Sequence, residues 1–580
     1  HLAYGVDSAA RLYLGKPGSQ LDLAESALLA AALEAPALNP IDAPAAALEK
    51  QQEVLGRLFA QGAISQDDYL QAQRKVLAFR QPLDPPNPTA QAFTRLAINQ
   101  LAGLYGRERL ERGGLRILTS LDYDLQLQVS CALRTQLARL EGRAPQASLP
   151  GGAECQASLL LPAFTPGGAA LPSSLTGSAL VTDPSTGEVL ALVGESTRSA
   201  ETSTLGDHPP GSLLSPFAAV AAFVRGYSPA SLVWDVPASR PAAIGQEGNP
   251  DRAYHGPQRL RTALANDYLV PLSQIIDQIG PTAVWRSAAA LGMGGLEGSR
   301  EPGALLYAGG GANLLQLAQA YGAFATLGME YGVSQAGSSS LQPVLVRAVE
   351  DLSGQGGIAA PAARSQTALS AALAYLVHDV LDDEAARWPS LGYPNPLEIG
   401  RPAGAKTGQT ADGLNAWAVG YTPQRLSAVW LGLPAGEDAA IDPLAAAGLW
   451  HALMQYTHRG LPSQDWTQPA GLSRVDVCDP SGALPTAACP NVVSELFLNG
   501  NEPAAADTLY RTYQINRETG RLATVFTPPG QVIEQTFLIA PPAAQEWAFE
   551  AQIPRPPEEY DTILVPPADA AVNIAQPARF

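Results

Sequence analysis

The stretch Gly404-Ala-Lys-Thr-Gly-Gln-Thr410, followed by Asn415-Ala-Trp-Ala-Val-Gly-Tyr421, decides the fold expected of this chain. Apolar residues run from Leu414 to Gly420 and again from Leu426 to Leu431, and runs of this length bounded by turn residues predict neighbouring strands. Lys406 is expected on the strand before them. A lysine there suits an acyl-transfer site, because its ammonium can hold a substrate carboxylate while the strand pairs with an extended peptide. A nucleotide-binding loop is excluded, because alanine rather than glycine precedes the lysine.

The charge balance narrows the class of partner. The 580 residues include 36 basic and 54 acidic side chains, and the only lysines are Lys16, Lys50, Lys75 and Lys406. A formal charge of -18 repels phosphate backbones and anionic lipid surfaces, so we expect no nucleic-acid partner. The apolar runs are shorter than a membrane span requires. Because the chain starts at His1 rather than Met, we expect any membrane anchor in a segment upstream.

The four cysteines fall into two local pairs, Cys131 with Cys155 and Cys478 with Cys489. Neither pair has Cys-x-x-Cys spacing, and the six histidines are scattered without ligand spacing. We therefore expect no metal and no cofactor. Two disulfides in an oxidising compartment are the expected state, and reduced buried cysteines are the alternative.

The order of helix, strand and turn signals predicts an α+β multidomain chain. A hairpin is expected within residues 180–193, where two apolar runs flank an Asp-Pro-x-x-Gly turn. Prolines concentrated in residues 81–88 indicate a domain boundary. The expected segments are a helical domain (1–80), a linker region with a strand, a helix and the Cys131/Cys155 loop (81–176), a mixed core (177–460), a small disulfide-bearing β-rich module (466–551) and a proline-rich tail (552–580).

A second candidate site is Pro209-Pro-Gly-Ser-Leu-Leu-Ser-Pro-Phe217, just ahead of an expected helix. This segment is similar to the active-site serine motif of class A penicillin-binding proteins, the bifunctional peptidoglycan synthases of the bacterial cell wall. Residues 254–265 resemble that family's approach to its Ser-x-Asn motif, and residues 315–324 resemble its following helix. Residues 408–432 look like the strands after its Lys-Thr-Gly motif.

The resemblance extends over about residues 1–550, because residues 1–16 and 23–30 look like the end of the family's glycosyltransferase domain. It implies an all-α glycosyltransferase remnant, a penicillin-binding/β-lactamase-like transpeptidase domain with a sheet flanked by helices, and a small β-rich C-terminal module. The family's two catalytic glutamates belong to motifs that would precede His1. Glu25 and Glu34 are therefore interpreted as helix-surface or first-turn carboxylates.

The resemblance also implies that Ser212 would attack a D-Ala-D-Ala stem peptide after a lysine one helical turn later had taken its proton. This chain has Ser215 at that position, and a hydroxyl is a poor base near neutral pH. No Ser-x-x-Lys motif exists anywhere in the sequence. We therefore interpret Ser212 as the N-cap of the following helix.

The second motif departs from the family as well. Asp267 stands where the family has its serine, and Leu269 stands at its asparagine without a donor or an acceptor. Only Lys406-Thr407-Gly408 is complete. Asp267 should face Ser212 and is expected to form an ion pair with Lys406.

Three hypotheses follow. The first is a cell-wall protein on the extracytoplasmic face of the bacterial membrane, whose transpeptidase-like domain is a non-catalytic binding or scaffold module. Its partners would be a stem peptide or glycan strand and other cell-wall synthesis proteins. The second is an active serine D,D-transpeptidase or carboxypeptidase in which Asp267 replaces the missing base at Ser212. The third is a secreted adhesive or structural protein, for which the paired cysteines and the acidic surface would suffice. It would gain support if Ser212, Asp267 and Lys406 lay far apart.

Overall fold

The computed structural model describes residues 5–79, 90–111, 113–145, 148–149, 152–163, 170–239, 249–294, 302–308, 310–334, 341–351, 357–358 and 362–562. The chain folds as two compact units. Unit 1 comprises residues 1–159, 176–205 and 331–365, and unit 2 comprises residues 160–175, 206–330 and 366–580. Because each unit is assembled from separate stretches, the five continuous segments remain a prediction. The proline-rich boundary at 81–88 lies outside the described residues, as does most of the tail.

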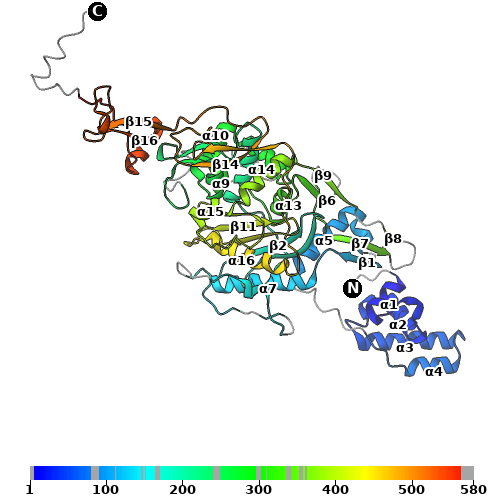
Figure 1. The fold of residues 1–580 in the computed structure, drawn as a ribbon. Helices are drawn as coiled ribbons and strands as arrows, with labels where there is room; N and C mark the ends of the chain where they lie inside the picture. Colours follow the sequence, from blue (N-terminus) through cyan, green and yellow to red (C-terminus); the bar gives the residue numbers. More distant parts are fainter. Residues whose placement is uncertain are drawn as a thin grey trace, which may run out of the picture. The chain divides into compact units, whose positions relative to one another are not determined.

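Helices form the N-terminal part of unit 1 (Figure 1, blue). The helices of this unit are α1 (Val6–Leu14), α2 (Leu23–Glu34), α3 (Pro44–Ala60), α4 (Gln66–Arg74), α5 (Gln91–Tyr105), α6 (Arg107–Glu111) and α7 (Tyr123–Leu140). Asp22 caps α2 by accepting the N–H of Glu25 at 3.1 Å. Glu25 is the first-turn carboxylate that was predicted, and it pairs with Lys16 at 2.6 Å. Glu34 lies on the helix surface, as predicted, and it forms an ion pair with Arg57.

The predicted hairpin is present in unit 1. Its strands, β2 (Thr176–Asp183) and β3 (Glu188–Ser196), pair antiparallel, and their apolar side chains are buried. The side chain of Gln126 on α7 donates to the carbonyl of Leu192 at 2.9 Å and accepts its N–H at 2.7 Å. The helix therefore packs on β3 through a satisfied buried amide. The other strands of this unit are β1 (Leu115–Thr119), β7 (Val346–Asp351) and β8 (Gly357–Ile358), which form one sheet. Strands β6 (Met329–Val333) and β9 (Ala363–Thr367) pair in another, and only residues 331–333 and 363–365 of them belong to unit 1.

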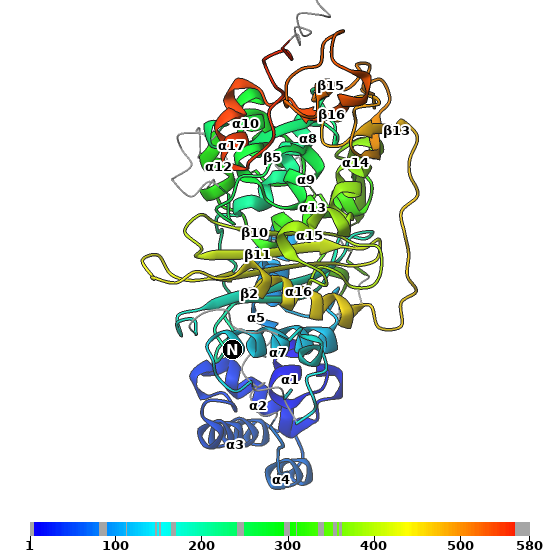
Figure 2. The same cartoon turned by 60° about the vertical axis from the view of Figure 1, so that its left-hand side comes forward.

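Unit 2 contains a meander of three antiparallel strands (Figure 2). These are β10 (Gly404–Gln409), β11 (Asn415–Tyr421) and β12 (Leu426–Gly432). The other elements before the C-terminal module are η5 (Gly211–Leu214), α8 (Ser215–Phe223), β4 (Leu232–Asp235), η6 (Pro237–Ser239), β5 (Gly256–Arg259), α9 (Leu260–Ala265), α10 (Leu269–Ile279), α11 (Pro281–Ala290), α12 (Pro302–Ala308), α13 (Leu314–Ala325), α14 (Ala371–Leu381), α15 (Glu384–Leu391) and α16 (Pro443–Thr457).

Helices cover both faces of the meander. Successive side chains of a strand point to opposite faces, so the neighbouring residues Gly420 and Tyr421 contact different helices. On one face Gly420 leaves room for Trp450 of α16, whose indole N–H donates to the Gly420 carbonyl at 3.3 Å. On the other face Tyr421 lies against His378 of α14. This arrangement confirms the predicted sheet flanked by helices.

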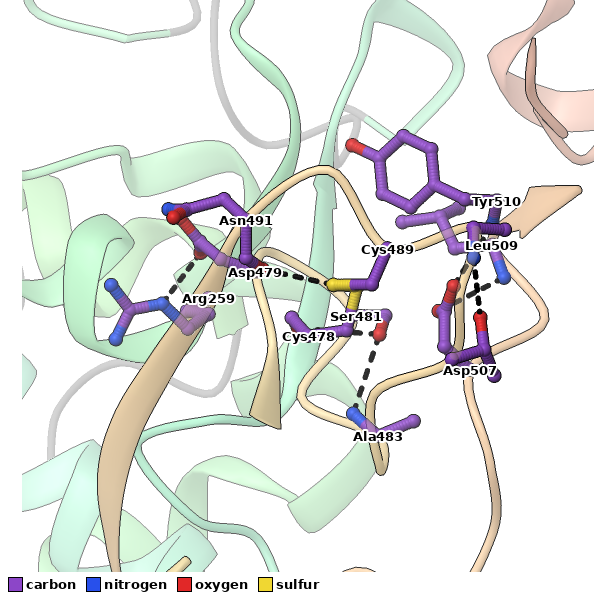
Figure 3. The surroundings of a disulfide bond; sticks show 12 residues. Arg259, Cys478, Asp479, Ser481, Ala483, Cys489, Asn491, Asp507, Leu509 and Tyr510 are labelled. Atoms are coloured by element: carbon purple, nitrogen blue, oxygen red, sulfur yellow. Dashed lines mark hydrogen bonds and ion pairs between the residues drawn. A yellow bond between two sulfur atoms is a disulfide. The ribbon is translucent and has the colours of Figure 1, made fainter. Parts of the chain in front are cut away.

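Two antiparallel strand pairs form the small β-rich C-terminal module. They are β13 (Leu472–Cys478) with β14 (Val492–Leu498) and β15 (Tyr510–Asn516) with β16 (Val532–Leu538), and α17 (Gln545–Glu550) follows them. A disulfide joins Cys478 to Cys489, and another joins Cys131 to Cys155 in unit 1, so both predicted pairs are confirmed. Beside the module disulfide, Arg259 donates to Asp479 at 2.7 Å (Figure 3). In the described part of the chain, no helix combines the length and apolarity needed to cross a membrane.

Candidate functional site

Ser212 lies in the 3₁₀ turn η5, one turn before α8 begins at Ser215. Its side chain makes no capping bond, and Leu214 occupies the N-cap position, so the N-cap interpretation was wrong. The extra turn directs the hydroxyl away from the helix. Ser212 Oγ donates to Asp267 Oδ2 at 3.0 Å and accepts the backbone N–H of Gln409 at 3.3 Å.

Two glycines allow η5 to approach β10 closely. Gly211 has a φ of 58°, and a Cβ there would lie 2.1 Å from the carbonyl oxygen of Gln409. A Cβ on Gly408 would lie 2.5 Å from the Leu213 side chain. The contact between Ser212 and the strand therefore depends on two missing side chains.

Replacing Gly211 with alanine is expected to destabilise unit 2 by about 1–3 kcal/mol, because the new methyl group meets a backbone carbonyl and the φ is strained. All eight tryptophans of the chain lie in unit 2, so tryptophan fluorescence during urea denaturation reports on this unit. Gly530→Ala is the matched control, because a Cβ there meets nothing within 4 Å. Equal unfolding midpoints for the two variants would contradict the close approach.

Asp267 occupies the turn between α9 and α10 with a φ of 55°, which is uncommon for an aspartate. Its Oδ1 accepts Lys406 Nζ at 2.5 Å, and the Lys406 ammonium also donates to the Thr407 carbonyl at 3.0 Å. The neighbouring Asn266 fixes the turn by donating to the carbonyl of Ala386 at 2.6 Å. The predicted ion pair with Lys406 is therefore present.

Burial controls the electrostatics of this cluster. The side chain of Lys406 is 3% exposed and that of Asp267 is 15% exposed. Burial raises the pKa of Asp267, and the Lys406 ammonium and the Ser212 hydroxyl offset this rise only in part. A serine, a carboxyl group and an ammonium thus meet in one desolvated position.

The other predicted site residues surround this cluster without adding a base. Ser215 is fully buried as the first residue of α8, and its Oγ has no hydrogen-bond partner among the described residues. Leu269 is buried at the start of α10. Thr407 and Gly408 continue the strand β10. The four cysteines lie elsewhere, in the two disulfides.

Sequence reasoning missed three supporting contacts. The Tyr321 hydroxyl donates to the Leu213 carbonyl at 2.9 Å, and the Trp417 indole donates to the Pro209 carbonyl at 2.9 Å. The backbone N–H of Gln409 holds Ser212. All three donors belong to stretches that resemble the family, but their contacts with a distant turn carry no local signal.

Three family models match consecutive parts of the chain. They are the transglycosylase model at residues 1–59, the transpeptidase domain of penicillin-binding proteins at 177–433, and the C-terminal domain of penicillin-binding protein 1A at 468–512. The chain belongs to the class A penicillin-binding proteins. The order of the three matches agrees with the order of motifs read from the sequence.

Known class A penicillin-binding proteins resemble this chain along most of its length. Penicillin-binding protein 1A of Clostridium botulinum (strain Langeland) is 26% identical over 92% of the chain, and penicillin-binding protein 1C of Escherichia coli K12 is 27% identical over 86%. The chain spans 66% and 58% of these two relatives, which is less than two thirds of each.

Solved structures agree on the fold. The crystal structure of penicillin-binding protein 1A from Haemophilus influenzae has a TM-score of 0.63 at 19% identity and covers 87% of this chain and 89% of its own. The PonA1 protein of Mycobacterium tuberculosis in complex with penicillin V has a TM-score of 0.51 at 20% identity, covering 66% of this chain and 97% of its own.

Proposed function

We propose that this protein acts in peptidoglycan synthesis and that its transpeptidase-like domain binds a stem peptide or glycan strand without being acylated. It would work at the extracytoplasmic face of the bacterial membrane together with other cell-wall synthesis proteins. The observation that carries the proposal is the ion pair of Lys406 with Asp267, at 2.5 Å. That ammonium belongs to the only lysine after residue 75, and it is committed to a carboxylate.

The proposal follows from the chemistry that acylation needs. A serine hydroxyl must lose its proton as it attacks a carbonyl carbon, and a base within hydrogen-bond reach must take that proton. Ser215, one turn after Ser212, offers a hydroxyl instead of an amine. Loss of one member of a cooperating catalytic set removes most of the rate. The edge of β10 can still pair with an extended peptide, because strand pairing needs no catalytic group.

A second candidate function is serine acyl transfer with Asp267 as the base. Two observations favour it: Ser212 Oγ donates to Asp267 Oδ2 at 3.0 Å, and burial raises the pKa of that carboxyl. In this mechanism the carboxylate takes the hydroxyl proton while Oγ bonds to the carbonyl carbon and the carbonyl π electrons move to oxygen. The C–N bond of the substrate then breaks, and the protonated Asp267 returns the proton to the leaving amine. The third hypothesis, an adhesive or structural protein, gains no support, because Asp267 contacts both Ser212 and Lys406.

A labelled penicillin separates the two candidates. We expect no covalent adduct on Ser212 of the wild-type protein at high antibiotic concentration, as judged by mass spectrometry after digestion. Restoring both motifs with Ser215→Lys, Asp267→Ser and Leu269→Asn should produce a labelled Ser212 peptide. Adding Ser212→Ala to this triple variant is the control and should abolish labelling.

Stoichiometric labelling of the folded wild-type protein would overturn the non-acylated proposal and favour the second candidate. In that case Asp267→Asn should abolish labelling, because an amide cannot take the proton. Binding is measured separately by co-sedimentation of the wild-type protein with purified peptidoglycan, where we expect enrichment in the pellet. Absence of binding and of labelling would refute both candidates for this domain.

A further inference from the structure

Arg387 of α15 is a buried cation with an unsatisfied edge. The residue is 3% exposed, and its Nη1 donates to the carbonyl oxygens of Leu381 at 3.0 Å and Ala405 at 3.4 Å. Its Nε and Nη2 have no hydrogen-bond partner among the described residues. Leaving charged donors unpaired in the interior is costly, so native proteins rarely do so without a bound partner.

The unpaired atoms form one functional edge. In a guanidinium group the N–H bonds of Nε and Nη2 project side by side and make the fork that binds anions in a bidentate manner. The two carbonyl contacts of Nη1 fix the orientation of the group, so the free edge is already held in place. Arginine is better suited than lysine to such a buried site, because its delocalised charge is weakly hydrated.

Arg387 lies beside a small pocket. Arg387 lines it together with Ala405, Lys406 and Thr407 of β10 and with apolar residues such as Leu397. Its volume is about 10 Å³, which is the space for one water-sized species.

The acidic groups near Arg387 are engaged elsewhere. Asp383 also lines the pocket, but its Oδ1 accepts the N–H of Ala386 at 3.0 Å and its Oδ2 accepts Arg261 Nη1 at 3.1 Å. Asp382 accepts the N–H of Ala403 at 2.7 Å. These carboxylates leave the Nε/Nη2 edge without a direct partner.

The carboxylate of Glu398 is likewise used by other groups. It accepts the Trp388 indole and the Asn395 amide, each at 2.8 Å. Burial lowers the pKa of Arg387, and Glu384 and the other nearby acids offset this only in part. The guanidinium therefore lacks a compensating charge at hydrogen-bond distance.

We propose that the pocket binds one monovalent anion of the size of chloride on the Nε/Nη2 edge of Arg387. An anion suits the site better than a water molecule, because both can accept the two hydrogen bonds but only the anion neutralises the buried charge. Bound chloride would hold the guanidinium against the Ala405 carbonyl and thereby brace the strand that carries Lys406. The pocket shares Lys406 and Thr407 with the Ser212 cluster, but the anion would bind to Arg387, so the proposal does not depend on acylation.

The test compares unfolding of the full chain in sodium chloride and in sodium gluconate at equal ionic strength, because gluconate is too large for the pocket. Tryptophan fluorescence should report a saturable rise in the melting temperature of unit 2 with chloride, of roughly 2–4 °C at tenfold excess over Kd. Arg387→Met should remove the chloride dependence. Arg511→Met, which removes an exposed arginine on β15, should retain it.

A second measurement covers the case in which Arg387→Met fails to fold. Crystals of the wild-type protein grown in sodium bromide should show one anomalous peak beside Arg387, at hydrogen-bond distance from Nε and Nη2. Equal melting temperatures in chloride and gluconate, or crystals without a bromide peak at this edge, would overturn the proposal and assign the pocket to water.

Discussion

Replacing Lys406 with methionine is expected to lower the free energy of unfolding of unit 2 by about 3–5 kcal/mol, because the change leaves the carboxylate of Asp267 buried without its countercharge. Both side chains are largely removed from solvent, and their charged atoms lie 2.5 Å apart. The remaining hydrogen bond from Ser212 cannot replace a full positive charge. Urea denaturation followed by tryptophan fluorescence measures the loss.

The double variant Lys406→Met/Asp267→Leu is the control for this experiment. Removing both charges together should recover most of the stability, because two apolar side chains of similar volume often replace a buried ion pair at little cost. A coupling energy near zero in the resulting cycle would contradict the ion pair. Strong coupling would support the proposal that the ammonium is committed to Asp267.

The second large effect is expected at Arg261 of α9. Its Nη2 lies 2.5 Å from Glu495 Oε1, its Nη1 lies 3.1 Å from Asp383 Oδ2, and it also contacts Asp379. Glu495 belongs to β14 of the C-terminal module and is completely buried. Arg261→Met should therefore cost about 3–5 kcal/mol in the same fluorescence assay. The buried Glu495 keeps only its ion pair with Arg259, and the partly exposed Asp379 and Asp383 lose the cation that they share with it.

Arg511→Met, on the exposed surface of the same module, is the matched control and should change stability by less than about 0.5 kcal/mol. The double variant Arg261→Met/Glu495→Leu should recover part of the loss. Wild-type stability in Arg261→Met would mean that the buried cluster contributes nothing to attachment of the module.

The same cluster predicts an acid-dependent loss of stability. Burial alone would raise the pKa of Glu495, but its hydrogen bond and ion pair with Arg261 outweigh burial and lower it. The folded state thus binds this proton more weakly than the unfolded state. Its contribution is present above the ordinary glutamate pKa and is lost as the pH falls toward the lowered value. The stability difference between wild type and Glu495→Gln should shrink over that range.

Single helices and hairpins could be predicted from the sequence, because the residues that start a helix or form a turn are neighbours in the chain. Helix α7 begins directly after Asp122, whose carboxylate accepts the N–H of Leu125 at 3.0 Å, and an aspartate at a helix N-cap is a local signal. The β2–β3 hairpin forms around its predicted turn. The prediction that Ser212 is a helix N-cap was wrong for a related reason. A serine before a helical run favours a cap, and the sequence does not reveal that a 3₁₀ turn comes first.

Sequence alone determined the family and the available functional groups. The order of motifs, the hydroxyl of Ser215 and the apolar Leu269 are properties of single residues, and folding does not change which groups can accept a proton. The tertiary structure decided which distant groups meet. It joins Lys406 to Asp267 across 139 positions, and it leaves one edge of Arg387, beside β10, without a hydrogen-bond partner in the part of the chain that the structure describes. These contacts depend on the path of the whole chain, because packing brings together residues that are far apart in the sequence and share no local pattern.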